Sequence, residues 1–457
     1  MWTRREFAAT LAAAAQPFSR PPNLVILLAD DLGWGDVGFH GGRTATPNVD
    51  RIAREGVELT RCYAFPYGTP TRAALLTGRM PVRYGLVYNS LRAWSPHGLP
   101  VDEHLLPQSL QAAGYQTACM GKWHLGNAHR RLLPNARGFD HFYGHLNTDI
   151  HYFTHRHMGG LDWQRNGESV EEDGYATTLL AAEAVAWMKR RDRARPFFLY
   201  VPFNAVHTPL TAPDEVMYRH RQLPHEKLRI LAGAIDAMDA AVGTILAALE
   251  EEKIADQTLV VFLSDNGGAP AQGSVNAPFR GSKGSVYEGG IRVPAAMRFP
   301  GRLRAGSKSA QVMAVTDLFP TLAAALGVAA GNRRPLDGRN LWPPLTGESV
   351  VANGPLFFAA KSNERADFRY AALDGDWKLV RVIEAGTPGR AEYLFDLRSD
   401  PGEGTDVLAA HPERTRELSA ALDGWIRLHP DGDLASSSRP HPGWVPPADY
   451  AAAARRD

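Results

Sequence analysis

The chain has 457 residues, of which 44% are hydrophobic, and a formal net charge of +1. This length and apolar content are enough for one large domain and a smaller one, which excludes a wholly disordered chain. Acidic and basic residues nearly balance, and no run of 18 or more apolar residues occurs, so we expect neither a nucleic-acid partner nor a membrane span.

The N-terminus reads MWTRREFAATLAAAAQPFSR. The pair Arg4 and Arg5 precedes Phe7 and a short alanine-rich run, with small residues suited to cleavage near Ala15. This order is typical of a twin-arginine export signal, whereas a disordered basic tail is the alternative. We predict a signal over residues 1–20 and an exported, periplasmic mature protein.

From residue 23 to about 330, short apolar runs alternate with longer segments of helical period. This alternation predicts a large, mostly parallel sheet covered by helices on both faces. The expected strands are 23–30, 116–121, 196–203 and 258–265, and the expected helices are 46–56, 176–190 and 227–252. In the last helix we interpret Asp236 and Asp239 as solvent-facing.

After the Gly/Pro-rich stretch 333–348 the pattern changes to short strand-like pieces at 354–361, 369–382 and 391–397, followed by a helix at 412–428. This pattern predicts a smaller α+β domain with an antiparallel sheet. We therefore divide the chain into a catalytic domain at 21–348 and a C-terminal domain with a tail at 349–457.

The only two cysteines, Cys62 and Cys119, lie far apart in apolar, strand-like contexts. Buried free thiols are the favoured interpretation, and one disulfide bridge is the alternative.

Oxygen-rich side chains follow two of the predicted strands. Asp30 and Asp31 come at the end of the first strand, and Asp265 and Asn266 come at the end of the strand 258–265. In open parallel sheets ligands bind beyond the carboxyl ends of the strands, so we expect the two clusters to meet. Three carboxylates and an amide carbonyl suit a hard divalent cation, Ca²⁺ or Mg²⁺.

The stretch YGTPTRAALLTGR, residues 67–79, indicates a loop that enters a helix. Thr69 is the expected cap, Pro70 the first helical residue and Gly78 the helix stop. Residue 68 would then lie just before a helix N-terminus, which favours an anion, and Arg72 lies one turn further on. Taken alone, the stretch is typical of an ordinary capped helix with a solvated arginine.

Further cationic or titratable residues follow strand-like segments. Lys122 and His124 belong to GKWHLG, His207 to NAVHTPL, and Lys283 to the glycine-rich FRGSKGSVYEGG. Facing the carboxylates, this set describes a site for an anionic ester bridged to a metal. The histidines are the candidate proton donors or oxyanion ligands, and the lysines are the candidate positive clamps.

Together these segments resemble the formylglycine-dependent sulfatase family of the alkaline-phosphatase-like superfamily. The resemblance is carried by LLADDLGWGD, TPNVDRIAREG, TPTRAALLTGR, GKWHLG, VHTPL, LSDNGG, GSKGSVYEGGIRVP, VTDLFPTLAAALG and EYLFDLRSDPGE, which cover nearly all of the chain after residue 20. It implies a substrate that is an aryl or carbohydrate sulfate ester.

The resemblance also implies a role for each matching position. The ligands of calcium are then Asp30, Asp31, Asp265 and Asn266. Arg72 and Lys122 stabilise the nucleophile and His124 assists its turnover. His207 and Lys283 bind the sulfate, with His207 as a candidate proton donor to the leaving group.

The family's nucleophile is a Cys or Ser that a formylglycine-generating enzyme oxidises to formylglycine, and here that position is Gly68. Glycine has no thiol or hydroxyl to oxidise, and Cys62 stands too early in the motif to replace it. Either the letter G stands for a modified residue, or the glycine is encoded and the covalent route is absent.

Three functions are open. The first is a calcium-dependent sulfate-ester hydrolase, provided that residue 68 is formylglycine. The second is an exported pseudoenzyme that binds sulfated glycans without cleaving them, and the third is a phosphoesterase of the same superfamily. The five histidines from His141 to His157 suggest a zinc site, but the interleaved aromatic residues favour a loop that is either substrate-lining or structural.

Overall fold

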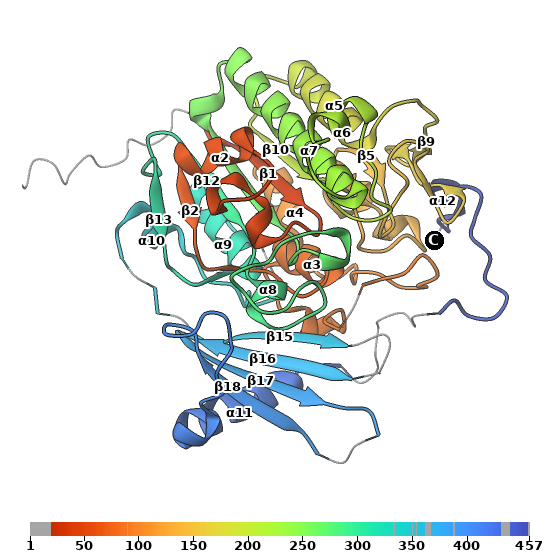
Figure 1. The fold of residues 1–457 in the computed structure, drawn as a ribbon. Helices are drawn as coiled ribbons and strands as arrows, with labels where there is room; N and C mark the ends of the chain where they lie inside the picture. The colour runs from red at the N-terminus through yellow and green to blue at the C-terminus, as the bar shows by residue number, and fades with distance from the viewer. Residues whose placement is uncertain are drawn as a thin grey trace, which may run out of the picture.

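The structure, a computed structural model, describes residues 20–88, 90–331, 334–349, 351–352, 354–361, 367–386, 389–430 and 439–455. The predicted export signal therefore lies outside the described residues, except for Arg20. Figure 1 shows a large sheet with helices on both faces and a smaller sheet below it.

The large sheet has ten strands, and its central five are parallel. Short antiparallel pairings extend it on both sides of this parallel centre. In spatial order the strands are β13 (Ser307–Ser309), β2 (Val57–Leu59), β12 (Ala295–Arg298), β11 (Thr258–Ser264), β1 (Asn23–Ala29), β10 (Phe197–Pro202), β4 (Gln116–Lys122), β5 (His141–His145), β8 (Gln164–Arg165) and β9 (Glu168–Ser169). The predicted mostly parallel sheet is confirmed.

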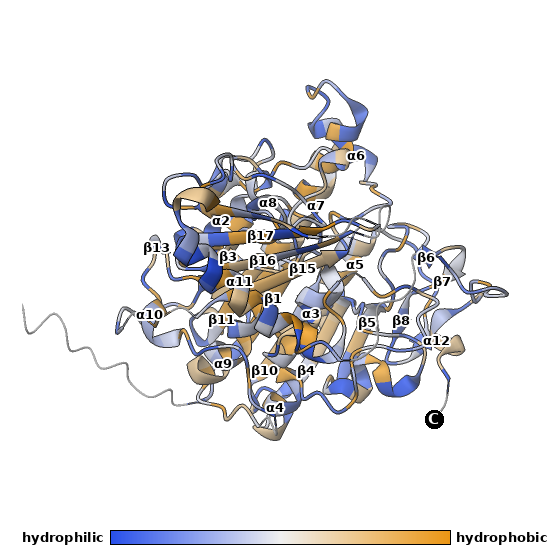
Figure 2. Ribbon diagram, turned by 90° about the horizontal axis from the view of Figure 1, so that it is seen from below, coloured by the Kyte–Doolittle hydropathy of each residue, from blue (hydrophilic) through white to orange (hydrophobic). Residues whose placement is uncertain are grey.

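Strand β1 explains why the centre of the sheet reads as a continuous apolar run. Its side chains alternate between two cores: Leu24, Ile26 and Leu28 face one, and Val25 and Leu27 face the other. A strand covered on both faces needs apolar residues at every position. Figure 2 accordingly shows the central strands coloured mainly as hydrophobic.

Different helices cover the two faces. The core on one face is completed by α2 (Pro47–Arg54), α5 (Ala176–Arg190) and α7 (Glu226–Glu251). The other face is covered by α3 (Gly68–Thr77), α4 (Leu106–Ala112) and α9 (Val315–Leu326). The helices predicted from the apolar period are confirmed, with ends within two residues.

Helix α7 is long, apolar and mostly buried in the protein. Of the helices in the described ranges, it alone is long and apolar enough to cross a membrane, but 67% of its most apolar window is buried in the protein, as in a core helix.

The interpretation of Asp239 as solvent-facing is wrong. Its carboxylate is 3% exposed and accepts hydrogen bonds from the amides of Asn48 and Val49, because the free N–H groups at the start of α2 need an acceptor.

Shorter elements complete the part of the molecule that contains the large sheet. They are β3 (Cys62–Tyr63) paired with β14 (Met313–Ala314), β6 (Arg156–His157) paired with β7 (Gly160–Leu161), α6 (Asp214–Arg219), α8 (Glu288–Ile291) and α10 (Trp342–Thr346). Cys62 and Cys119 are free and buried, as expected, and burial raises the pKa of the Cys62 thiol to about 12.

The smaller sheet is antiparallel and has four strands, β15 (Leu356–Lys361), β16 (Phe368–Asp374), β17 (Trp377–Ile383) and β18 (Ala391–Asp396). Helix α11 (Pro412–Ile426) packs against it. The predicted α+β character is confirmed, while the boundary at residue 348 stays a prediction. Residues 439–455, with α12 (Tyr450–Ala453), return to the large sheet beside β9 (Figure 1).

A buried ion network joins the smaller sheet to helix α8 beside the large sheet. Lys378 Nζ, from β17, lies 2.9 Å from Glu288 Oε1 and 2.8 Å from Glu403 Oε1. All three side chains are fully buried, and Glu288 begins α8, five residues after Lys283. The smaller sheet therefore contacts the segment that carries a candidate site residue.

Candidate active site

The two oxygen-rich clusters meet at the carboxyl ends of β1 and β11. The Asp31 amide donates to Asp265 Oδ1 at 3.2 Å, and Asn266 Nδ2 donates to Asp31 Oδ1 at 2.8 Å. These three side chains and that of Asp30 are buried. Neighbouring parallel strands end at the same edge, which explains how residues distant in sequence come together.

Three cations surround the carboxylates. Arg72 donates from Nη2 to Asp265 Oδ2 at 2.9 Å and to Asp30 Oδ2 at 3.2 Å. Lys122 Nζ donates to Asp30 Oδ2 at 2.5 Å, and Lys283 Nζ donates to Asp31 Oδ2 at 2.7 Å. Burial would raise the pKa of Asp31, but the charges of Lys283 and His207 outweigh it and lower that pKa.

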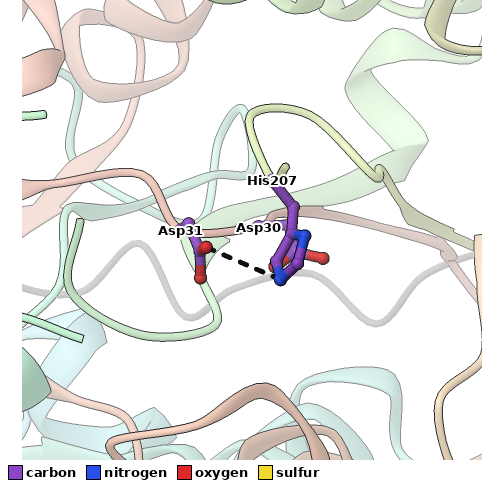
Figure 3. A group of neighbouring side chains, drawn as sticks. All are labelled: Asp30, Asp31 and His207. Carbon is purple, nitrogen blue, oxygen red and sulfur yellow. Dashed lines mark ion pairs between the residues drawn. The ribbon is translucent and has the colours of Figure 1, made fainter. Parts of the chain in front are cut away.

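The residues at this edge fit a hard divalent cation. Among the described residues, Asp30 Oδ1 and Asn266 Oδ1 are buried oxygens without a hydrogen-bond partner, and such atoms are costly unless something else binds them. Asp30, Asp31 and His207 each offer a ligand atom, and these atoms lie within 4.8 Å of one another (Figure 3). Carboxylate and amide oxygens are the ligands that Ca²⁺ prefers.

Helix α3 brings residue 68 to the carboxylates. The helix begins at Gly68, with Tyr67 as its N-cap residue, and ends at Gly78 in the left-handed conformation. Thr69 is therefore not the cap: its hydroxyl donates to the His124 carbonyl at 3.2 Å and accepts from the Leu91 amide at 3.1 Å. The helix starts two residues earlier than predicted, at Gly68 instead of Pro70.

The surroundings of Gly68 show what a side chain there would meet. A Cβ atom at this position would lie 2.7 Å from Asp265 Oδ2 and 3.5 Å from both Arg72 Nε and His124 Nδ1. The Cα of residue 68 thus points into the group of charged side chains. A larger residue requires the Asp265 carboxylate to turn away, although this group is buried and accepts hydrogen bonds from Arg72 and the Asp31 amide.

His124 presents a bare nitrogen toward residue 68. Its Nε2 lies 3.1 Å from the Leu91 carbonyl, so Nε2 carries the proton and donates. Within the described part of the chain, Nδ1 has no partner. Burial and the charges of Lys122 and Arg72 hold the pKa of His124 well below its usual value. The ring is therefore neutral, with a free acceptor at Nδ1.

His207 lies on the other side of the site. Its Nδ1 is 2.6 Å from the Thr208 carbonyl, and its Nε2 is 3.7 Å from Asp31 Oδ2, as the dashed line in Figure 3 marks. Burial and the charge of Lys283 lower the pKa of His207 to about 4. The fixed Nδ1–H leaves Nε2 to face the ligand.

The charges of the site favour an anion once a divalent cation is bound. The three buried carboxylates, Asp30, Asp31 and Asp265, are matched in number by Arg72, Lys122 and Lys283. A bound divalent cation therefore leaves the pocket with net positive charge. Such a pocket favours a sulfate group, whose charge the same side chains can stabilise.

The chain matches the sulfatase family model over residues 22–328. The chain belongs to the sulfatase family. It is 36% identical to N-acetylgalactosamine-6-sulfatase of Homo sapiens over 452 residues, covering 88% of this chain and 84% of the relative. It is 32% identical to arylsulfatase A of Homo sapiens, covering 90% and 88%. The solved structure of Ps i-CgsB in complex with k-i-k-neocarrahexaose is similar to it, with TM-score 0.84, 32% identity and coverage of 92% and 95%.

By family, this sulfatase is a sulfuric ester hydrolase, and sulfatases of this family act on sulfate esters that include carbohydrate sulfates. The family-model match includes every residue of the candidate site, from Asp30 to Lys283. The resemblance stated from sequence is confirmed at the level of the family. The role of each residue stays a prediction.

The histidine-rich loop of the sulfatase, residues 141–157, contains both site-facing and structural residues. His145 is paired in register with Lys122, and its buried ring nitrogens lack partners among the described residues. His157 Nδ1 lies 2.9 Å from Asp149 Oδ1, while His141 pairs with Glu183. Of the described residues, no group in this loop meets the geometry of a metal site, so zinc receives no support.

Tyr152 is a site residue that the sequence did not reveal. Its hydroxyl is 2.9 Å from the carbonyl oxygens of both Asn204 and His207, so it fixes the turn that carries His207. Its ring stacks on Tyr175, with centroids 5.2 Å apart. An aromatic residue in a loop gives no sequence signal for such a contact, because the partner is a backbone atom distant in sequence.

Proposed function

We propose that the protein recognises the sulfate ester of a carbohydrate at a Ca²⁺ centre formed by Asp30, Asp31, Asp265 and Asn266, and that residue 68 decides whether the ester is hydrolysed. One observation carries this proposal: three carboxylates, an amide and three cations form one buried cluster, and Asp265 and Arg72 of this cluster lie beside residue 68. Such an arrangement suits a charged ester that reacts at that point.

The cation, when bound, supplies positive charge that polarises the ester oxygens. Lys283 and His207 then bind the sulfate group. The negative charge of the bound ester favours a second proton on His207, at Nε2, which can pass to the leaving oxygen. Arg72 and Lys122 stabilise negative charge at residue 68. His124 Nδ1, which is neutral and unpaired within the described residues, accepts a proton from a group attached there.

Hydrolysis by the family's route needs an aldehyde hydrate at residue 68. If the gene encodes Cys and a formylglycine-generating enzyme acts on it, the site is complete and the protein is a hydrolase. The sequence carries Gly68, which favours the second candidate function, that of a pseudoenzyme. In that case the protein is an exported pseudoenzyme that binds sulfated glycans without covalent turnover.

The proposal also specifies a carbohydrate substrate and an exported location. The carbohydrate is supported by the relative named N-acetylgalactosamine-6-sulfatase and by the neocarrahexaose complex of Ps i-CgsB. The periplasm is supported by the twin-arginine pattern at Arg4 and Arg5.

Two measurements test the proposal. The intact mass of the peptide that carries residue 68 separates the candidates: the mass of glycine excludes the formylglycine route, and the mass of an aldehyde or its hydrate establishes it. Calorimetric titration with N-acetylgalactosamine 6-sulfate and with carrageenan oligosaccharides should show binding in Ca²⁺ and none in EDTA. Binding that is equal in both conditions would remove the metal centre from the account.

A further inference from the structure

A pocket of about 250 Å³ lies between a loop near the candidate site and residues 439–455, which we name the C-terminal strap. The half-buried rings of Trp94 and Trp444 meet there with centroids 5.3 Å apart and planes at 68°. The polar members of its lining include Asn127, His441, Tyr450 and Arg455. A volume of this size is close to the lower end of small-molecule sites, which is about 300 Å³.

Backbone hydrogen bonds hold the C-terminal strap against the large domain. The Leu161 amide donates to the Ala448 carbonyl at 2.8 Å. The Arg455 amide donates to the Ala128 carbonyl, and the Arg130 amide donates to the Arg455 carbonyl, both at 3.1 Å. The wall of the pocket is therefore pre-formed, which lowers the ordering cost of binding a ligand.

The first wall of the pocket, which includes Trp94 and Asn127, is connected to the candidate site. Trp94 follows Leu91 by three residues, and the Leu91 carbonyl accepts the hydrogen bond from His124 Nε2. Asn127 Nδ2 donates to Asn147 Oδ1 at 2.9 Å, and Asn147 belongs to the histidine-rich loop. The pocket thus lies one loop away from His124.

The second wall leads to the same place. Tyr450 lines the pocket, and burial together with the charges of Asp162 and Asp149 raises the pKa of its hydroxyl. The Tyr450 ring lies 5.6 Å from the His157 ring between centroids, and His157 Nδ1 lies 2.9 Å from Asp149 Oδ1. Both walls therefore adjoin the histidine-rich loop, one through Asn147 and the other through His157.

The chemistry of the pocket matches a sugar. Indole rings offer flat apolar faces that pack on the C–H face of a pyranose, and an amide and a hydroxyl can bond its hydroxyl groups. Tyr450 belongs to the lining of the pocket, while its hydroxyl is buried. None of the described residues that line the pocket is acidic, and Arg455 is basic, which favours an anionic chain.

We propose that this pocket binds the sugar units next to the sulfated one, so that the protein recognises a sulfated oligosaccharide longer than a monosaccharide. The inference rests on the proposed function, because the sulfated unit must occupy the site beside residue 68. It adds that the C-terminal strap supplies half of the glycan-binding surface.

The test is calorimetric titration of the full chain in Ca²⁺ with N-acetylgalactosamine 6-sulfate, with size-defined chondroitin 6-sulfate oligosaccharides and with carrageenan oligosaccharides. The unaltered protein should bind a hexasaccharide at least tenfold more tightly than a monosaccharide, since a tenfold change in Kd needs only about 1.4 kcal/mol. Trp444→Ala should weaken hexasaccharide binding roughly tenfold or more, as expected for truncating a ligand-contacting tryptophan, and leave monosaccharide binding unchanged.

The matched control is Trp377→Ala, which removes a half-buried tryptophan of β17 that contacts His411 away from this pocket. It should change neither affinity. A hexasaccharide bound no more tightly than the monosaccharide would overturn the pocket and leave the proposed function intact. An equal loss for both ligands in Trp444→Ala would also overturn it, because the tryptophan would then act on the site itself. Failure of every ligand to bind the unaltered protein would overturn both proposals.

Discussion

Replacing Lys378 with methionine tests the contact between the two sheets. Lys378 is fully buried between Glu288 and Glu403, so Lys378→Met leaves two buried carboxylates facing each other without a cation between them. Removing one partner of a buried ion network costs about 3–5 kcal/mol. Glu288 keeps the Tyr63 hydroxyl at 2.9 Å and Arg292 at 3.4 Å, which places the loss near the lower end of this range.

The assay is urea denaturation followed by circular dichroism, with thermal unfolding as a second measurement. For a chain of 457 residues the unfolding entropy is about 1 kcal/mol/K, so the loss corresponds to a Tm lower by about 3–5 °C. Lys308→Met is the matched control, because Lys308 is 66% exposed in its ion pair with Glu58 and should contribute about 0–1 kcal/mol.

A second substitution checks the cause. Lys378→Met combined with Glu403→Gln should recover part of the loss, because one unpaired buried charge is removed. If Lys378→Met cost no more than Lys308→Met, the two sheets would not depend on this network, and the reasoning would be refuted.

The remaining predictions concern the metal, helix α2 and residue 68. Ca²⁺ at a hundredfold excess over its Kd should stabilise the protein by about 2.7 kcal/mol in thermal unfolding. The Asp31→Asn variant should lose this stabilisation, and the control Asp236→Asn should keep it. Equal Ca²⁺-dependent shifts of Tm in both variants would argue against the site. Asp239→Ala should cost about 1–3 kcal/mol, because it leaves buried amides unpaired, and a neutral result would restore the solvent-facing interpretation. Gly68→Ala should lower stability in EDTA by about 1–3 kcal/mol, since its Cβ would meet Asp265 at 2.7 Å, and an unchanged Tm would show that the carboxylate turns away freely.

The sequence predicted the sheet well because its centre is covered on both faces. Continuous apolar runs such as that of β1 are typical of strands of this kind, and the oxygen-rich residues after Ala29 and Ser264 mark the strand ends. The convergence of these residues followed from the geometry of parallel strands alone.

Other features depend on contacts that no local pattern encodes. The interpretation of Asp239 was wrong because helical period separates polar from apolar faces but does not show which polar residue meets another helix end. Thr69 had the residue type of a cap, yet its hydroxyl binds the His124 carbonyl from another segment. Tyr152 and the pocket beside the C-terminal strap likewise arise from segments far apart in sequence.

The central claim is that everything except the nucleophile is in place around residue 68. Gly68→Cys, co-expressed with a formylglycine-generating enzyme and verified by mass, should hydrolyse 4-methylumbelliferyl sulfate in Ca²⁺. We expect a kcat/KM at least about a thousandfold above that of Gly68→Ala, which has a Cβ atom and nothing to oxidise. Full conversion to formylglycine with turnover no greater than that of Gly68→Ala would contradict the account.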